Sequence, residues 1–342
     1  MEDMDINWKK RSRSHIERRR LMERKLLKSC VIMGMIIHFI VCGSHVAFGQ
    51  EKFPTKTIEV SNMFGPGGGT DIFVRTLAID ARRILKVPIV VSNITAGQGV
   101  AATKYVLDQP ADGYTLLAFG PEQIFNAILG RIDYREFEGV IMCQQDQGMY
   151  FVNKDSKFKT IQEVIKFAKE NPGKLKIAAT GAASFDEVLV KQFNMKTGLE
   201  ITYVPYESAS QAKAALVGGH IDLLYEEPGV VISLIDAGTI VPLIVFTEER
   251  LKRFPNVPTG RELGINITFG RWRGLAVKKG TNKERIKILH DGFKKAMEGD
   301  VYKTVTHTQM LDLRPGYLTP EDFTKFWYEQ EKIYSDILKP TR

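Results

Sequence analysis

The sequence predicts an α/β protein in which short strands and helices alternate. Apolar runs of strand length are followed by segments of helix length through most of the chain, and glycine-bearing loops join the first of them. This alternation is typical of a mostly parallel, doubly wound sheet with helices on both of its faces. Residues 114–119, an apolar run bounded by turn residues, fit a strand that is buried on both faces.

The chain is organised around a glycine-rich loop between an expected strand, residues 58–63, and an expected helix, residues 72–85. The loop consists of Phe64, Gly65, Pro66, Gly67, Gly68, Gly69, Thr70 and Asp71. Glycines allow positive φ angles and a close approach of a ligand to main-chain amides, and Thr70 and Asp71 are suited to cap the helix. The free amides and the dipole of a helix start favour an anion, so we expect a carboxylate or a phosphate here. The alternative is a glycine-rich turn without a ligand.

Two nucleotide-binding motifs are excluded at this loop. A Walker loop needs a lysine and a hydroxyl residue after its last glycine, whereas Thr70 and Asp71 follow here. The dinucleotide motif would need glycine or alanine at position 70. We therefore expect no nucleotide cofactor.

A second loop repeats this arrangement later in the chain. Gly181, Ala182, Ala183 and Ser184 lie between an expected strand, residues 175–180, and an expected helix, residues 185–196. The start of that helix again offers free amides. The other expected strands are residues 89–92, 201–204, 220–225 and 240–246, and the other expected helices end near residues 107, 170, 217, 237 and 338.

Residues 1–49 are typical of a secretion signal. Ten lysines and arginines precede an apolar core, residues 30–43, and Ala47-Phe48-Gly49 offers small residues where a signal peptidase cleaves. The mature chain would then begin near Gln50. The apolar core is shorter than the roughly 20 residues of a membrane span. A retained anchor is the alternative to cleavage, and Met22 is an alternative translation start.

The charge and the few cysteines and histidines exclude several classes of protein. The whole chain has 48 lysines and arginines against 40 acids, and removing residues 1–49 takes away 10 of the former and 5 of the latter, which leaves a net charge of +3. The remaining charges are interspersed, so we expect no nucleic-acid partner. After residue 49 only Cys143 remains, which excludes an internal disulfide, and the three remaining histidines are too widely spaced to suggest a metal site.

Several motifs occur in the order and spacing found in one family. They are Phe53-Pro54, Gly65-Pro66-Gly67-Gly68-Gly69-Thr70-Asp71, Asp112-Gly113-Tyr114-Thr115-Leu116-Leu117, Asn171-Pro172-Gly173-Lys174-Leu175, Val204-Pro205-Tyr206, Gly218-Gly219-His220-Ile221-Asp222 and Val257-Pro258-Thr259. Over essentially the whole mature chain, the sequence resembles the periplasmic solute receptors of tripartite tricarboxylate transporters. The resemblance implies a type II periplasmic binding protein fold, with two doubly wound lobes joined by two crossover segments and a small carboxylate held between them.

The resemblance also implies the limits of the lobes and the residues of the site. Lobe 1 would comprise residues 50–140 and 237–342, with the C-terminal helices, and lobe 2 would comprise residues 141–236. The ligand-binding residues implied by the matching motifs are Phe64, Gly67, Gly68, Gly69, Thr70, Asp71, Thr180, Gly181, Ala182, Ala183, Ser184 and Tyr206. In the family, loops at these places hold the carboxylate largely through backbone amides and water.

Three stretches depart from the pattern of the family. The second-lobe loop, commonly polar and rich in Ser and Asn, reads Gly-Ala-Ala-Ser-Phe-Asp-Glu over residues 181–187. Ser208-Ala209 stands where Gly-Ser is common, and Glu226-Glu227 stands where one acid is usual. Fewer side-chain donors and more carboxylates lower the affinity that we expect for a polyanion such as citrate.

We therefore expect a monomeric, non-enzymatic receptor in the periplasm. It would capture a small organic acid and deliver it to the inner-membrane permease subunits of a transporter. A receptor that presents its ligand to a membrane sensor kinase is the first alternative, and an enzyme on the same bilobed scaffold is the second. The chain has no G-x-S-x-G elbow, and Cys143 has no histidine near it in sequence. We therefore expect no catalytic residues, no cofactor and no metal.

Overall fold

The computed structural model describes residue 22 and residues 52–182, 184–268, 270–314 and 316–338. The chain divides into two units between Lys52 and Phe53, and the second unit, Phe53–Arg342, carries the fold described below. The expected signal, residues 1–49, lies outside the described residues except for Met22. Within the described part of the chain, no helix is long and apolar enough to cross a membrane.

The first sheet of this unit has five strands in the order β2-β1-β3-β10-β4. The strands are β1 (Ile58–Asn62), β2 (Ile89–Asn93), β3 (Thr115–Phe119), β4 (Phe137–Gln145) and β10 (Trp272–Lys278). β1 pairs in parallel with β2 and β3, whereas β10 lies antiparallel between β3 and β4. A strand from late in the chain is therefore inserted between two early ones.

The second sheet also has five strands, in the order β7-β6-β8-β5-β9. The strands are β5 (Met149–Asn153), β6 (Lys176–Thr180), β7 (Thr202–Tyr206), β8 (Leu223–Glu226) and β9 (Ile240–Val245). β6 is parallel to β7 and β8, and β5 is antiparallel to β8 and β9. The expected α/β fold with two sheets is confirmed, and each sheet is mixed rather than fully parallel. β9, which the sequence analysis placed with lobe 1, pairs in this second sheet, and the limits of the lobes stay a proposal.

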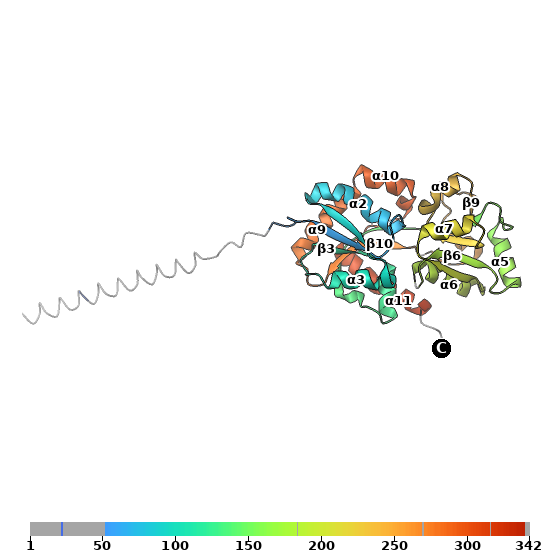
Figure 1. Ribbon diagram of the computed structural model, residues 1–342, viewed down its shortest axis with the longest axis horizontal. Coiled ribbons are helices and arrows are strands. Elements are labelled where there is room, and N and C mark those ends of the chain that lie inside the picture. Colours follow the sequence, from blue (N-terminus) through green and yellow to red (C-terminus); the bar gives the residue numbers. More distant parts are fainter. Residues whose placement is uncertain (1–21, 23–51, 183, 269, 315, 339–342) are drawn as a thin grey trace, which may run out of the picture. The chain divides into compact units, whose positions relative to one another are not determined.

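Helices cover both faces of the first sheet (Figure 1). They are α2 (Gly69–Leu85), α9 (Lys283–Met297) and α10 (Asp300–Thr308) on one face, and α3 (Val100–Leu107), α4 (Pro121–Ile128) and α11 (Pro320–Leu338) on the other. The side chains of β3 alternate between these layers, because Leu116 belongs to the core under α2 whereas Leu117 and Phe119 belong to the core under α11. Phe119 stacks on Trp327 with 4.0 Å between ring centroids.

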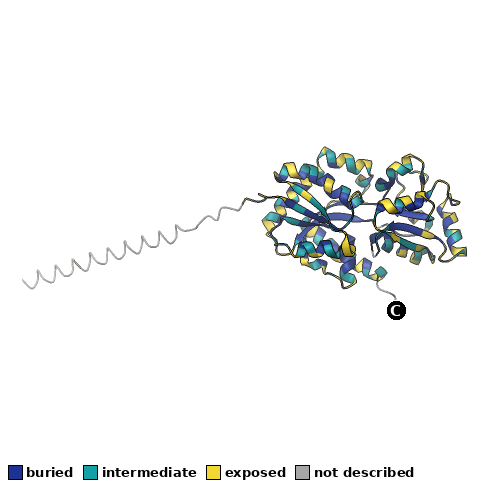
Figure 2. Ribbon diagram, viewed as in Figure 1, coloured by how far each residue is buried: buried dark blue, intermediate teal, exposed yellow. Residues whose placement is uncertain are grey.

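The second sheet is covered in the same way. α5 (Ile161–Glu170) and α6 (Phe185–Thr197) pack on one face, and α7 (Ala209–Val217) and the short α8 (Ile232–Asp236) pack on the other. α11 also contacts α6, so one hydrophobic core continues from the first sheet to the second. Figure 2 shows the inner strands of both sheets as mostly buried and the outer faces of the helices as exposed, whereas the edge strands β2 and β7 are partly exposed. Short 3₁₀ turns occur at Ala96–Gly99, Tyr134–Glu136, Pro228–Val231, Arg261–Leu263 and Leu311–Leu313.

Several helix starts follow from capping residues in the sequence. The side chains of Thr160 and Ser184 accept the amides of Glu163 and Glu187 at the starts of α5 and α6. α2 is different, because it begins at Gly69 with Gly68 as its N-cap and without a side-chain cap. The prediction that Thr70 or Asp71 caps this helix is therefore wrong, since both residues lie inside its first turn.

Candidate functional site

A cleft runs between the carboxyl ends of strands from both sheets. Its inner part is a cavity of about 40 Å³, which has room for a few water molecules. Its outer part is a hollow of about 1000 Å³ that shares Phe64, Thr180 and Glu207 with the inner cavity. A ligand of more than a few atoms therefore needs the outer hollow, or an inner cavity widened by movement of its walls.

The start of α2 forms one wall of the inner cavity. Phe64, Gly68, Gly69 and Thr70 line this wall. Gly67, which does not line it, has a positive φ of 78°, whereas Gly68 and Gly69 do not have a positive φ. Gly68 has no side chain that could accept the first amides of α2. These amides have no partner within the helix, so the wall presents donors to an anion.

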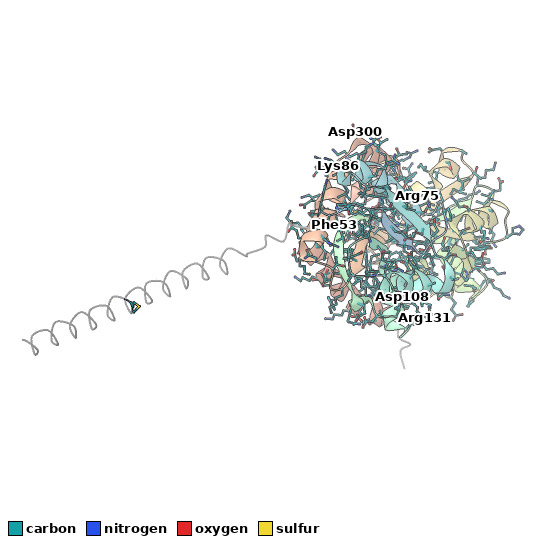
Figure 3. The ribbon with its side chains drawn as sticks, turned by 60° about the vertical axis from the view of Figure 1, so that its left-hand side comes forward. Phe53, Arg75, Lys86, Asp108, Arg131 and Asp300 are labelled. Atoms are coloured by element: carbon teal, nitrogen blue, oxygen red, sulfur yellow. The ribbon has the colours of Figure 1, made fainter. Side chains whose placement is uncertain are left out.

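Asp71 holds the loop and faces away from the cavity. Its carboxylate accepts hydrogen bonds from the amide of Gly67, from Asn93 and from Arg75, which projects from α2 (Figure 3). Burial alone would raise the pKa of Asp71, but the hydrogen bonds from Arg75, Asn93 and Gly67 lower it. Asp71 and Gly67 line neither part of the cleft. We propose that they shape the loop and do not contact the ligand.

The second-lobe loop lies in the outer part of the cleft. Thr180, Gly181, Ala182, Ser184 and Tyr206 line the outer hollow together with Phe64. The hydroxyl of Ser184 donates to the carbonyl of Gly181 and accepts the amide of Glu187, so it is engaged within its own loop. Ala183 lies outside the described residues. The structure thus brings the two predicted loops to one cleft, with few free side-chain donors in the second.

Two arginines that the sequence analysis did not single out dominate the inner cavity. Arg271 and Arg273 flank Trp272 at the start of β10, and both are at least 95% buried. Because residues two apart in an extended chain point to the same side, both guanidinium groups reach the cleft. The sequence feature that could have indicated them is a pair of arginines two positions apart, one just before and one within the strand-length run Trp272–Lys278.

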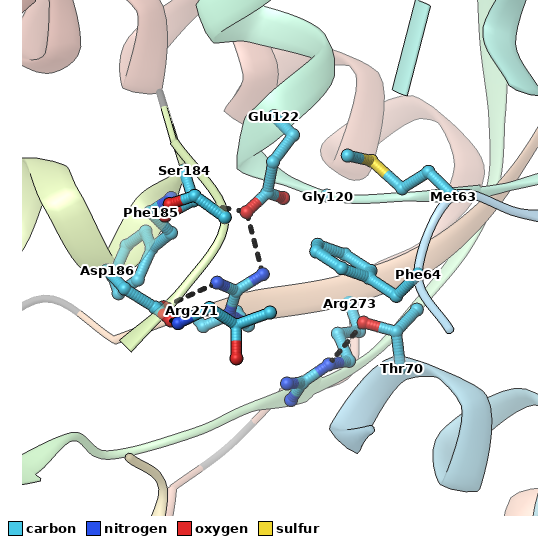
Figure 4. Close-up of polar contacts among 12 residues, drawn as sticks. Met63, Phe64, Thr70, Gly120, Glu122, Ser184, Phe185, Asp186, Arg271 and Arg273 are labelled. Carbon is cyan, nitrogen blue, oxygen red and sulfur yellow. Dashed lines mark hydrogen bonds and ion pairs between the residues drawn. The ribbon is translucent and has the colours of Figure 1, made fainter. Parts of the chain in front are cut away.

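Arg271 lies among three buried carboxylates from different parts of the chain, and Figure 4 labels two of them, Glu122 and Asp186. Its Nη1 donates to Glu122 of α4 at 2.7 Å, and its Nη2 donates to Asp186 of α6 at 2.6 Å. Its Nε lies 3.2 Å from Glu227, which follows β8. Arg271 therefore connects the first sheet to two elements of the second.

Arg273 is held by a parallel set of contacts. Its Nε donates to the hydroxyl of Thr70 at 3.0 Å, and its Nη2 lies 3.4 Å from Glu227. Its Nη1 pairs with Asp146, which lies between β4 and β5. Glu227 thus contacts both arginines. A Cβ at Gly69 would lie 2.5 Å from Nη2 of Arg273, so a side chain at this position would shift the guanidinium group.

The acids of this cluster outnumber the arginines, and their pKa values reflect it. Burial raises the pKa of Glu227 to about 7, although Arg271 opposes the shift. Burial and the charge of Glu227 raise the pKa of Glu226 well above its ordinary value, and burial also raises that of Asp186. At neutral pH the cluster therefore retains protons that exposed carboxyls would lose.

Because the buried carboxyl groups hold protons that the unfolded chain releases, we expect the protein to lose stability as the pH rises toward neutrality. Between the ordinary value of 4.5 and about 7, Glu227 holds a proton in the folded chain that the unfolded chain has released. The free energy of unfolding therefore falls with rising pH, by about 3 kcal/mol across this range for one such group. Urea denaturation at pH 5 and pH 7.5 measures the fall. Glu227→Gln should reduce it, whereas the exposed Glu170→Gln should not, and equal falls in all three proteins would contradict this assignment.

The described residues contain no group of three or more His, Cys, Asp or Glu side chains placed to hold a metal ion. What the arrangement offers is a set of main-chain donors, two paired arginines and an excess of carboxyl groups around a small cavity. Such a set binds and orients a charged solute.

The chain matches a family described as the tripartite tricarboxylate transporter family receptor over residues 73–341. The "UPF0065 protein in gbd 5'region" of Cupriavidus necator is 32% identical over 292 residues, which are 84% of this chain and 88% of that protein. The crystal structure of a TctC solute-binding protein from Polaromonas, without ligand, is 25% identical with a TM-score of 0.65, and the match covers 84% of this chain and 99% of that one. MatC from Rhodopseudomonas palustris, solved with bound malate, shares the fold at 22% identity with a TM-score of 0.76, over 84% of this chain and all (100%) of MatC.

These similarities confirm both the family resemblance and the two-lobed periplasmic binding protein fold. The chain belongs to the receptor family of the tripartite tricarboxylate transporters, a family of non-enzymatic periplasmic solute-binding proteins.

Proposed function

We propose that this protein captures a small organic carboxylate in the cleft between its sheets and delivers it to the permease subunits of a tripartite transporter. The observation that carries this proposal is the uncapped start of α2, at Gly68, on the wall of a cavity that Arg271 and Arg273 also line. The first amides of the helix and its dipole favour an anion. The membership of a receptor family gives this anion site its role.

The ligand carboxylate is placed by this proposal at Gly68, Gly69 and Thr70. Thr180 and Phe64, which line both parts of the cleft, would contact the remainder of the ligand, and Gly181, Ala182, Ser184 and Tyr206 would line its outer end. The malate held by MatC, a protein of the same fold, is consistent with a small organic acid as the class of ligand. We further propose that the receptor acts as a monomer in the periplasm after removal of residues 1–49.

A thermal-shift screen of the protein purified from periplasmic extract tests this function. We expect at least one mono- or dicarboxylate to raise the melting temperature by about 5–10 °C at a hundredfold excess over its Kd, because such binding stabilises the folded state by about 2.7 kcal/mol. Sodium sulfate at equal ionic strength is the control for nonspecific anion effects. The mass of the same preparation shows whether residues 1–49 were removed.

The screen includes mono-, di- and tricarboxylates, amino acids, aromatic acids and neutral sugars. Stabilisation by sugars alone, or by no compound that carries a carboxylate, would contradict the proposal. Citrate should bind weakly or not at all, since the inner cavity is small and rich in carboxyl groups.

A further inference from the structure

The protein's own Glu122 places a carboxylate at the start of α6, where a helix start favours an anion. Its Oε1 accepts the amide of Phe185, the first residue of α6, at 3.2 Å, and it also accepts Nη1 of Arg271 at 2.7 Å (Figure 4). Glu122 comes from α4, on the first sheet, and is only 3% exposed. One of the two facing helix starts is therefore already bound to a carboxylate.

Every nitrogen of the two guanidinium groups already lies beside a partner within the chain. The three nitrogens of Arg271 contact Glu122, Asp186 and Glu227. The three nitrogens of Arg273 contact Thr70, Asp146 and Glu227. Each guanidinium nitrogen thus already lies beside a partner within the chain, and an incoming carboxylate would have to share these nitrogens with the chain's own acids.

The cavity wall has carboxyl groups in excess over cations. Of its described lining residues, Asp186, Glu207, Glu226 and Glu227 are acids, and Arg271 and Arg273 are the bases. Glu226 is only 5% exposed, and among the described residues no lysine or arginine forms an ion pair with it. One of its oxygens accepts the amide of Glu227, and the side chain lines the cavity. A cation that entered here would meet an acid without a lysine or arginine partner and would favour its ionised form, whereas a second carboxylate would add to the excess of acids.

We propose, on the basis of the carboxylate-receptor function above, that this cleft selects a ligand with one carboxylate and one cationic nitrogen over a dicarboxylate of the same length. The carboxylate lies against the first amides of α2, and the cationic nitrogen faces Glu226 and Glu227. Glu122, by filling the start of α6, removes the second place at which a dicarboxylate would be held.

Isothermal titration calorimetry with matched pairs of ligands tests this selectivity. Each pair keeps the number of methylene groups and exchanges one carboxylate for an ammonium group: β-alanine with succinate, 4-aminobutyrate with glutarate, and 5-aminovalerate with adipate. In the pair that binds most tightly, we expect the affinity of the amino acid to be at least about tenfold higher than that of the dicarboxylate, as opposite charges in a desolvated site allow.

A dicarboxylate that binds as tightly as its amino acid, or tighter, overturns the selectivity and leaves the carboxylate-receptor function intact. No binding by any member of these pairs or of the broader screen overturns both.

Replacement of Glu226 gives the matched variant test. Glu226→Gln keeps the shape of the side chain but cannot ionise beside a cation, so the ratio of amino acid to dicarboxylate affinity should fall by about tenfold. Glu170→Gln, at an exposed position on α5, should leave the ratio unchanged. Both variants should have the circular dichroism spectrum of the wild type. A folded Glu226→Gln protein with an unchanged ratio overturns the assignment of the cation to this acid.

Proton release is an independent readout of the same contact. Burial raises the pKa of Glu226, the charges of Glu227 and Asp186 raise it further, and Lys213 opposes them. A cation placed beside Glu226 lowers this pKa and drives off the proton. Titrations at pH 7 in phosphate and in Tris, whose ionisation enthalpies differ, should therefore show net proton release for the amino acid. Absence of release, or proton uptake, overturns the proposed contact.

Discussion

Replacing Arg271 by methionine is expected to lower the free energy of unfolding by about 3–5 kcal/mol. Methionine fills most of the space, but it leaves Glu122, Asp186 and Glu227 as neighbouring acids without the guanidinium group that pairs with all three. Each of these acids is at most 6% exposed, so water cannot replace the lost contacts. Urea denaturation at pH 7.5, in the absence of ligand, measures the change.

Arg250→Met is the matched control for this substitution. Arg250 pairs with Glu262 at 2.8 Å on the surface, where both side chains are more than 40% exposed. Exposed pairs of this kind contribute little to stability, so this variant should unfold nearly as the wild type does. The difference between the two variants should shrink at pH 5, where the buried acids can take up protons instead of remaining as unpaired charges. Equal stability of the two variants at pH 7.5 would show that the Arg271 cluster does not hold the sheets together.

The strands and helices that could be predicted from the sequence are those whose boundaries are set locally. β1, β3 and β6 follow from short apolar runs with turn residues on either side, and α5 and α6 follow from the capping residues Thr160 and Ser184. These signals lie within a few residues of the element that they define. The glycine loop before α2 could also be predicted from local sequence. The first residue of α2 was predicted wrongly, because the N-cap is Gly68, which has no side chain to mark it as a cap.

The place of β10 could not be predicted in this way. Residues Trp272–Lys278 form an apolar run, but nothing within the run determines that it inserts antiparallel between β3 and β4. That pairing depends on shape and hydrophobic burial across the whole sheet, to which residues far apart in sequence contribute. The position of the arginines beside Trp272 in the cleft therefore follows only from the pairing of β10 in the folded sheet.

The composition of the site depends on the same long-range contacts. Arg271 is 149 residues from Glu122 and 85 residues from Asp186, so no local motif connects them. The sequence did show the unusual Glu226-Glu227 pair and the loss of polar residues in the second-lobe loop. Glu226 and Glu227 do line the inner cavity, but the two arginines that contact the acids of this cavity wall became visible only in the folded chain.

Gly68→Val is expected to weaken binding of the best ligand from the screen by about a hundredfold or more, with little change in stability. Gly68 has a φ of −80° and a ψ of 165°, which valine adopts readily, so its backbone needs no glycine. A Cβ at this position would have only the carbonyl oxygen of Gly65 within 4 Å, at 3.7 Å. The added side chain therefore enters open space on the cavity wall, beside the amides proposed to hold the carboxylate. Each lost charge-assisted hydrogen bond costs about 1.5–3 kcal/mol, and a micromolar ligand has only about 8 kcal/mol of binding free energy in total.

Thr70→Ser is the control in the same loop, because serine keeps the hydroxyl that accepts Nε of Arg273, and its Kd should stay within about threefold of wild type. Thermal melting without ligand should place Gly68→Val within a few degrees of wild type, which separates a blocked site from an unfolded one. If the folded Gly68→Val protein binds the ligand as tightly as wild type, the carboxylate does not lie at the start of α2. The ligand would then have to be held in the outer hollow, where Thr180, Gly181 and Tyr206 are the next residues to replace.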